Sequence, residues 1–194
     1  MEFYGNTKIR NDYSSVDNFI KSFISTYRDC YTTKIFTRAE MLELLGLKEE
    51  WLIKYNIKIT TNFKDTLYIT NYPCPLKAKL EGSHYILPIS TYINFHKALY
   101  LLFVADINDP NLVVDHIDTN PLNNHLENFR LITRKQNYSR NCINSICLEG
   151  FKKNNWSIEM FKEMLSKLAI WADWGVNDLC NEKELEKITA FLLK

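Results

Sequence analysis

The segment from residue 112 to residue 142 constrains the fold more than any other part of the chain. A short apolar run, LVVD, leads into the polar stretch HIDTNPLNNHLE, and a second partly apolar run, NFRLI, follows. Runs rich in β-branched and aromatic residues, separated by Asn, Asp and Pro, predict strands joined by a loop. Thr133 can cap a following helix, which carries Asn137. The pattern therefore predicts the order strand, loop, strand, helix.

Asp115 and His116 stand where the first of these strands leads into the loop. Hydrolysis of a phosphodiester needs a base for water and a cation for the charge that develops in the transition state. A histidine titrates near neutral pH and suits the base, whereas the oxygen ligands of Asp115 and Asn137 suit Mg²⁺ or Mn²⁺ better than zinc. Because side chains alternate along a strand, we expect Asp115 and His116 to point to opposite sides unless the strand ends there.

The residues VVDHIDTNPLNNHLENFRLITRKQN resemble the core motif of HNH nucleases, especially the phage-type homing endonucleases with a ββα-metal fold. Asn128 and Asn137 stand 12 and 21 positions after His116, which is the spacing of that family. The resemblance implies that His116 is the general base and that Asp115 and Asn137 bind the divalent metal. It also implies that Asn128 belongs to the catalytic set, because it holds the motif loop through backbone hydrogen bonds.

The resemblance covers about residues 66–141, since FHKALYLLFVADINDPN and LYITN are similar to elements that precede the motif in phage members. The sequence departs from the family in two places. YPCPLK replaces a glycine-and-arginine pattern after LYITN, and Thr119 stands where the family usually has glycine. A threonine disfavours a left-handed turn, which Asn120 could adopt in its place, so we expect a loop of altered shape.

A net charge of +1 gives no overall attraction to nucleic acid, but residues 128–153 are distinctly basic. Neutralising phosphates dominates non-specific DNA affinity, although a basic helix face is commonly just solvated. His125 resembles a family position near the DNA backbone, with an exposed loop histidine as the alternative, and His96 is expected to be a packed structural histidine. The candidate DNA-binding residues are His125, Arg130, Arg134, Lys135 and Arg140.

We predict an α+β fold, in which a ββα-metal HNH core with a small antiparallel sheet is flanked by helical modules. The first module, residues 1–56, carries a helix over 37–46 with a Thr37–Glu40 capping box and a short helix over 49–55. This pair resembles a helix-turn-helix, which either reads DNA or covers a hydrophobic core. The nuclease domain spans 57–150, with the sheet at 57–94 and the motif at 112–142. The last module, 151–194, carries helices over 157–174 and 181–193.

Composition excludes several other classes of protein. Hydrophobic residues make up 46% of the chain and charged residues 24%, as is usual for folded domains. The five cysteines form no CxxC pair, so we expect buried thiols rather than disulfides or structural zinc. No secretion signal or membrane-length apolar run is present, so we expect an intracellular protein. The family resemblance implies a phage or mobile-element product in the cytoplasm of a bacterial host.

These features favour a metal-dependent endonuclease that hydrolyses double-stranded DNA. The resemblance implies 5′-phosphate and 3′-hydroxyl ends. One site attacks one strand at a time, so a monomer would nick, whereas a double-strand break would need a homodimer or sequential cuts. Two alternatives stay open at this point. One is a non-cutting DNA-binding regulator built on the HNH scaffold, and the other is an inhibitor that binds a protein through the helical ends.

Overall fold

In a computed structural model the chain divides into two compact units. Taken together, its helices and antiparallel strands form an α+β protein, which confirms the predicted fold class. We call residues 1–31 together with 134–194 the helical unit, and residues 32–133 the mixed unit. The structure describes residues 12–27, 36–50, 57–59, 66–69, 76–77, 79–81, 84–87, 93–143 and 145–194.

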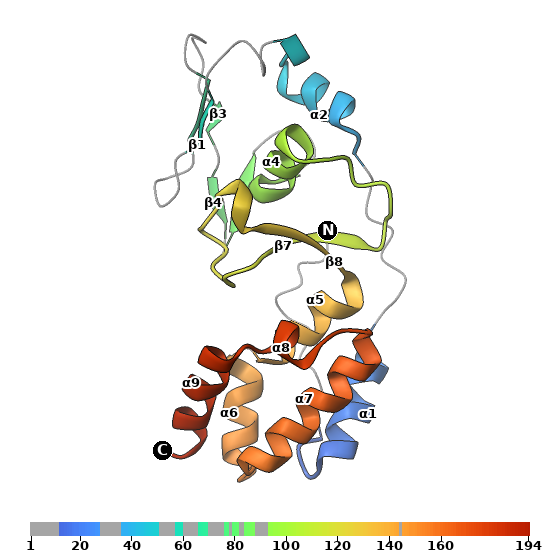
Figure 1. Cartoon of the computed structure of the whole chain (residues 1–194), viewed down its shortest axis with the longest axis vertical. Coiled ribbons are helices and arrows are strands. Elements are labelled where there is room, and N and C mark those ends of the chain that lie inside the picture. Colours follow the sequence, from blue (N-terminus) through green and yellow to red (C-terminus); the bar gives the residue numbers. More distant parts are fainter. Residues whose placement is uncertain are drawn as a thin grey trace. The chain divides into compact units, whose positions relative to one another are not determined.

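The helical unit combines one helix from the start of the sequence with the helices that follow the motif (Figure 1). Because this unit is built from two separate stretches of the chain, the observed units differ from the three consecutive modules predicted from the sequence. Its elements are α1 (Val16–Thr26), α5 (Arg134–Arg140), the 3-10 turn η2 (Asn141–Ile143), α6 (Ser145–Lys153), α7 (Ile158–Ala172), α8 (Val176–Leu179) and α9 (Glu182–Leu192).

Aromatic side chains explain why α1 packs with helices distant in sequence. Phe19 and Phe23 of α1 are fully buried. The Phe19 ring lies edge-to-face with Phe151 and Trp156, at centroid distances of 4.9 and 5.6 Å. Burial of such a ring stabilises by about 1.5–3 kcal/mol, and a favourable ring pair adds about 1 kcal/mol. A helix periodicity reveals that α1 has an apolar face but not which helices cover it.

The two predicted C-terminal helices are confirmed as α7 and α9. The Ser157 hydroxyl accepts from the Met160 backbone N–H at 3.2 Å, which caps α7. Asn181 and Glu184 form a reciprocal capping box at the start of α9. Among the described residues, none of the helices combines the length and the apolar character that crossing a membrane requires.

Three cysteines contribute to the interior of the helical unit. The thiols of Cys142, Cys147 and Cys180 are buried, as predicted for Cys142 and Cys147. Burial raises the pKa of the Cys147 and Cys180 thiols to about 11 in each case, and it raises the pKa of Cys142 well above the ordinary value. These side chains therefore behave as small apolar groups at neutral pH. Cys30 and Cys74 lie outside the described residues.

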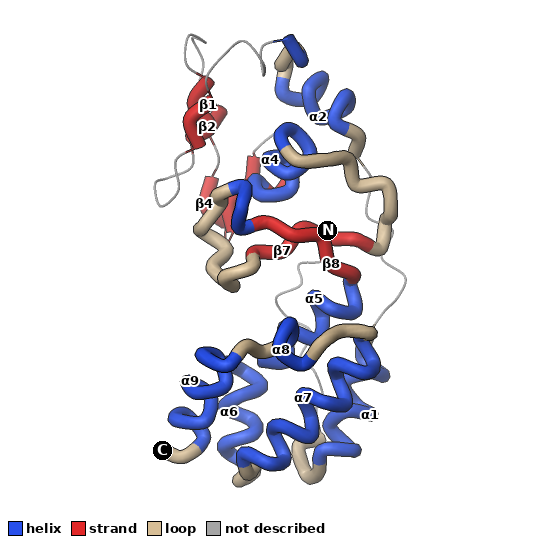
Figure 2. Tube along the Cα trace, viewed as in Figure 1, coloured by secondary structure: helices blue, strands red, loops and turns tan. Residues whose placement is uncertain are grey.

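The described residues of the mixed unit form short strands, two helices longer than a single turn and the motif hairpin (Figure 2). The region from 57 to 94, predicted as one small sheet, forms two three-stranded antiparallel sheets, ordered β1-β2-β3 and β4-β5-β6. Its elements are α2 (Arg38–Leu45), β1 (Ile57–Ile59), β2 (Thr66–Ile69), β3 (Leu76–Lys77), β4 (Lys79–Glu81), β5 (His84–Leu87), β6 (Ile93–Asn94), α4 (Phe95–Phe103), β7 (Leu112–His116), the 3-10 turn η1 (Leu126–Asn128) and β8 (Phe129–Thr133).

Helix α2 begins and ends where the sequence predicts. Thr37 and Glu40 form the predicted capping box, and Gly46 ends the helix in the left-handed conformation at φ 64°. Of the second helix predicted over 49–55, residues 51–56 lie outside the described residues, so the helix-turn-helix hypothesis stays a prediction. Residues 70 and 71 of LYITN and residues 72–75 of YPCPLK also lie outside the described residues.

Helix α4 forms the centre of the mixed unit and supports the motif hairpin. Its residues Leu99 and Leu101 are fully buried, and they share one apolar cluster with Val114 of β7 and Phe129 of β8. An apolar helix face against one face of a hairpin is a stable two-layer arrangement. The first residues of the motif are therefore fixed on a packed base.

Candidate active site

The hairpin of β7 and β8 determines where the motif residues point. The strands are antiparallel, with Asp115 opposite Arg130 and His116 opposite Phe129. Along β7 the buried residues alternate, so that Val114 and His116 are buried while Asp115 between them is partly exposed. Asp115 and His116 therefore lie on opposite faces of the hairpin, as the alternation of a strand predicts.

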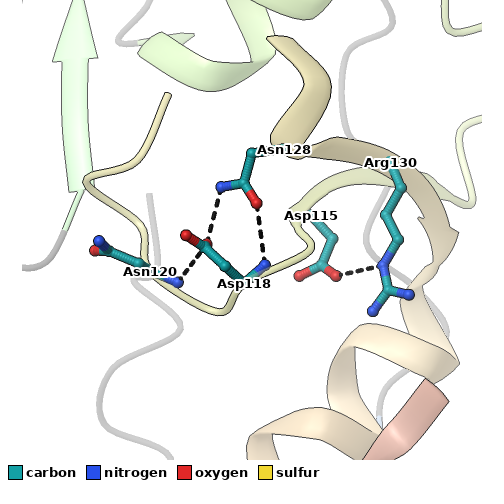
Figure 3. Close-up of polar contacts among 5 residues, drawn as sticks. All are labelled: Asp115, Asp118, Asn120, Asn128 and Arg130. Atoms are coloured by element: carbon teal, nitrogen blue, oxygen red, sulfur yellow. Dashed lines mark hydrogen bonds and ion pairs between the residues drawn. The ribbon is translucent and has the colours of Figure 1, made fainter. Parts of the chain in front are cut away.

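Asp115 is held by an ion pair with the residue opposite it. The Arg130 Nε donates to Asp115 Oδ2 at 3.0 Å, and the two side chains are 26% and 13% exposed (Figure 3). Such a charge-assisted bond is stronger than a neutral one, and it orients the carboxylate. Arg130, predicted to contact phosphate, is thus engaged with Asp115 in this structure.

The Asp115 carboxylate also fits a divalent cation by its chemistry. Its oxygens are hard donors, which Mg²⁺ and Mn²⁺ prefer, and Mg²⁺ sites in enzymes commonly use one or two carboxylates together with water and phosphate. Partial exposure leaves the carboxylate reachable, while Arg130 holds it in one orientation. A cation at this position would compete with the guanidinium of Arg130 for the same negative charge.

His116 is packed into the base of the hairpin and is only 6% exposed. Its ring lies edge-to-face with His96 at a centroid distance of 4.9 Å and with Phe129 at 5.3 Å. His96, at the start of α4, is buried as predicted for a packed histidine. The ring of His116 is therefore fixed by neighbours on two sides, which is the rigid placement that a general base requires.

Asn128 closes the loop between the two strands. Its Oδ1 accepts from the Asp118 backbone N–H at 3.0 Å, and its Nδ2 donates to Asp118 Oδ1 at 2.8 Å (Figure 3). Its Nδ2 also donates to the Asn123 carbonyl at 2.8 Å. The buried amide of Asn128 thus connects Asp118 and Asn123 of the loop to the start of β8. This is the kind of contact that the resemblance implies for Asn128, and its part in catalysis stays a prediction.

Asp118 is the second centre of the loop, and sequence reasoning gave it no role. Its carboxylate accepts from the Asn120 backbone N–H at 2.9 Å and from Asn123 Nδ2 at 2.7 Å, besides Asn128. Partial burial alone would raise the pKa of Asp118, but the bonds from Asn123 and Asn128 outweigh it and lower the pKa. The stability that this carboxylate contributes is present above its unfolded-state pKa and is lost as the pH falls through the lowered folded-state value.

The loop turns at Thr119 itself, which has a φ of 63°. The left-handed conformation that Asn120 could have adopted is thus found at Thr119 instead. The turn is closed by the Thr119 backbone N–H, which donates to the His116 carbonyl at 3.0 Å. The bonds of Asp118 and Asn128 on either side hold the residue in a conformation that β-branched side chains rarely adopt.

We expect Thr119→Gly to stabilise the protein. Holding a non-glycine residue in the left-handed region destabilises the folded state by about 1–3 kcal/mol. Glycine avoids that strain, but its greater conformational freedom in the unfolded chain lowers the free energy of unfolding by about 0.5–1 kcal/mol. The net gain of about 1 kcal/mol corresponds to a rise in Tm of about 3 °C, measurable by scanning calorimetry. Thr119→Ala, which keeps a Cβ, is the control and should give a smaller shift. Equal shifts for both variants would show that backbone strain is not the cause.

The remaining predicted site residues are divided between the two units. His125 is exposed and precedes η1 in the mixed unit. Asn137, the predicted second metal ligand, is half-buried on α5 in the helical unit, and α5 begins directly after β8. Lys135 is exposed, with its Nζ 5.5 Å from the Trp171 ring centroid, Arg140 is half-buried, and Arg134 is only 7% exposed.

The structure also identifies Asn124, which sequence reasoning placed in the loop without a role. Its Oδ1 lies 3.1 Å from His116 Nε2, and both residues are buried. The usable signal in the sequence was the density of Asn and Asp between the strands, because such side chains bond to nearby backbone and fix loop shape. That density predicts a tightly bonded loop but does not say which amide faces the histidine.

Comparison with protein families supports this assignment of the motif. Residues 95–138 match the family model described as HNH endonuclease. The match runs from the first residue of α4 through β7 and β8 into α5, and it lies inside the span over which the sequence resembles the family. Comparisons with curated proteins and with solved structures found no match. The match therefore supports an HNH endonuclease assignment for the segment over residues 95–138.

Proposed function

We propose that this protein is a metal-dependent endonuclease that hydrolyses phosphodiester bonds of double-stranded DNA and belongs to the phage-type homing enzymes. The observation that carries the proposal is the pairing of Asp115 and His116 on opposite faces of one strand end, inside a segment that matches the HNH family. In this arrangement the Asp115 carboxylate can bind a cation while the His116 imidazole accepts a proton from water, so that neither group has to do both.

The residues have distinct tasks in the proposed reaction. His116 takes a proton from the attacking water, and Asp115 with Asn137 would hold one Mg²⁺ or Mn²⁺. A cation bound there would stabilise negative charge on the phosphate and on the departing 3′ oxygen. Asn128 keeps the loop, and with it the end of β7, in one shape through its bonds to Asp118 and Asn123. Rigid placement of this kind lowers the barrier because reacting groups need not be reordered.

Arg130 has two possible partners in the proposed enzyme, and both are anions. In the structure its Nε bonds to Asp115. Neutralisation of Asp115 by a cation would weaken that ion pair, and the guanidinium could then bind a DNA phosphate, a ligand that arginine recognises well. Lys135 and His125 are exposed and are proposed to contact the DNA backbone, together with Arg140, whereas the buried Arg134 would have to move first.

The test is cleavage of supercoiled plasmid by the purified chain with Mg²⁺, with Mn²⁺ or with EDTA. We expect nicked or linear DNA with either metal and intact DNA with EDTA, because the proposed transition state needs a cation. The ratio of nicked to linear product, followed over time and protein concentration, separates a nicking monomer from a dimer that cuts both strands. Labelled ends then show whether the products carry 5′-phosphate and 3′-hydroxyl groups.

A long recognition sequence can be absent from one plasmid, so the assay includes genomic DNA from bacteria and their phages. Intact DNA throughout, with metal-independent DNA binding in a gel-shift assay, would replace the proposal with a non-cutting regulator. Intact DNA without any DNA binding would favour the protein-binding alternative. Cleavage that persists in EDTA would contradict the metal requirement while leaving the nuclease assignment in place.

A further inference from the structure

Helix α5, which carries the proposed metal ligand Asn137, is too short to hold its own position. It has seven residues, Arg134–Arg140. Isolated helices shorter than about 12–15 residues are marginal in water, so a helix of this length depends on the elements that pack against it. The contacts of α5 inside the helical unit therefore decide where Asn137 lies in that unit.

Tyr138, the residue after Asn137, packs against aromatic side chains of α1 and α7. Its ring centroid lies 4.4 Å from that of Phe23 and 5.3 Å from that of Tyr27, at the end of α1. The Trp171 ring of α7 lies edge-on to it at 6.4 Å. Phe23 is fully buried. Because protein interiors are closely packed, the Tyr138 ring cannot shift without displacing these neighbours.

The hydroxyl group of Tyr138 adds a directional bond to the last turn of α1. Tyr138 Oη lies 2.5 Å from Thr26 Oγ1, and the Thr26 hydroxyl donates to the Phe23 carbonyl at 2.8 Å. A hydroxyl has only one proton, so Thr26 accepts from Tyr138. Tyr138 Oη also lies 3.5 Å from the Phe23 carbonyl. Carbonyls in a last turn have no partner within the helix, so this end of α1 is suited to hold the hydroxyl.

Other polar contacts of α5 hold it less firmly against its neighbours. Gln136 Nε2 donates to the Asp173 carbonyl at 3.4 Å, an exposed contact that water can replace. Ser139 is fully buried, but its hydroxyl donates to the Lys135 carbonyl within α5 itself. Tyr138 combines ring packing with a hydrogen bond to another helix, so it is the main anchor of α5 on α1.

We propose that Tyr138 is a positioning residue for Asn137, because it fixes α5 on α1 and thereby places the Asn137 amide oxygen for the divalent cation. The proposal rests on the proposed nuclease function, in which Asn137 is a metal ligand. The two residues are neighbours on one helix, so a shift of Tyr138 also moves Asn137. Mg²⁺ demands near-ideal geometry, and a misplacement of about 1 Å caused by a distant substitution can lower a rate about 100-fold. Helix α1, which precedes the segment that matches the HNH family, thus supports the nuclease site.

The side-chain amide of Asn137 can report metal binding without DNA cleavage. In the full chain labelled with ¹⁵N-asparagine, paramagnetic Mn²⁺ broadens the magnetic resonance signals of nearby amides, and Asn137→Ala identifies the Asn137 signal by its loss. We expect Tyr138→Leu to raise the Mn²⁺ concentration at half broadening about 10–100-fold, as loss of a supporting partner does at other metal sites. Tyr138→Phe keeps the ring and loses one hydrogen bond, so it should raise that concentration only about threefold.

Two matched substitutions separate positioning from simple loss of stability. Phe23 and Phe161 are both fully buried in the helical unit. Phe23→Leu alters the contact with Tyr138 from a position 115 residues earlier in the chain. Phe161 packs against Phe151 of α6, with ring centroids 5.8 Å apart. Urea titration should show similar losses of stability for the two variants, whereas only Phe23→Leu should raise the Mn²⁺ concentration at half broadening. A merely structural role of Tyr138 would give both variants the same response to Mn²⁺.

DNA cleavage provides a second measurement of the same defect. A displaced ligand weakens metal binding but leaves the base in place, so Tyr138→Leu should need more Mn²⁺ for half-maximal cleavage. At saturating Mn²⁺ its kcat should recover to within a few-fold of the wild-type value, which a simple loss of folded protein would not allow.

The outcomes distinguish this proposal from the proposed function. Wild-type protein that leaves all DNA intact overturns the proposed function and this proposal with it. Metal-dependent cleavage with an Asn137 signal that stays sharp in Mn²⁺ overturns Asn137 as a ligand, and this proposal, while the nuclease assignment stands. An unchanged Mn²⁺ response in Tyr138→Leu and Phe23→Leu, or an equal shift in Phe161→Leu, overturns the role of Tyr138 alone. Should Tyr138→Leu fail to fold, as judged by circular dichroism, the comparison of Phe23→Leu with Phe161→Leu still decides the question.

Discussion

Replacement of His116 with alanine is expected to lower the rate of DNA cleavage by about 10²–10⁴-fold, because general base catalysis typically contributes that much. The loss should appear in kcat, since the ring is buried against His96 and Phe129 and is not placed to bind DNA. Single-turnover cleavage of a labelled duplex with saturating protein measures the chemical step. DNA affinity, measured in Ca²⁺ or EDTA, should change by less than about threefold.

Two controls make the His116 result specific. Because His116 is buried, His116→Gln is tested alongside His116→Ala, since glutamine fills more of the space and lets the fold be retained without a base. His84→Ala, on β5, removes a histidine to which no role is assigned and should leave cleavage unchanged. Cleavage by both His116 variants within a few-fold of wild type would exclude His116 as the base.

Phe19→Ala is expected to destabilise the helical unit by about 3–5 kcal/mol, the usual cost of truncating a fully buried phenylalanine. The ring contacts Tyr13, Phe23, Phe151 and Trp156, with centroid distances between 4.9 and 6.0 Å, and no part of it is exposed. The free energy of unfolding is measured by urea titration followed by tryptophan fluorescence. Trp156 lies beside the substituted ring and so reports on this core.

Ile170→Ala provides the matched control for Phe19→Ala. Ile170 lies on α7, in the same unit, but it is 81% exposed, so its truncation should change the free energy of unfolding by less than about 0.5 kcal/mol. A loss below about 1 kcal/mol for Phe19→Ala would contradict the packing of α1 with the helices that follow the motif.

The sequence predicts local structure well where a local chemical signal exists. The predicted capping box of Thr37 and Glu40 gives the start of α2 directly, because it satisfies backbone groups at the helix terminus. Alternation along β7 likewise predicts that Asp115 and His116 point to opposite faces. These features depend on residues a few positions apart, so a linear pattern contains them.

Features that depend on distant contacts could not be predicted in this way. The apolar face of α1 was visible, but its partners Phe151 and Trp156 stand more than a hundred residues later. The left-handed conformation of Thr119 contradicts the local preference of threonine, because the bonds of Asp118 and Asn128 override it. The ion pair of Arg130 with Asp115 also depends on such a contact, because the strand register places the two residues opposite each other, while contact of Arg130 with DNA stays a prediction.

The origin of the helical unit in two separated stretches of chain has a consequence for biosynthesis. Residues 32–133 leave the ribosome as one continuous piece, whereas α1 is made before them and its partners in α6 and α7 are made after them. At translation rates of about 5–20 residues per second, α1 waits on the order of ten seconds before its core can close. During that interval Phe19 and Phe23 have no native cover, which makes the nascent chain a substrate for chaperones. A ribosome that stops before residue 145 would therefore release β7, β8 and α5 together with an α1 whose partners in α6 and α7 are missing.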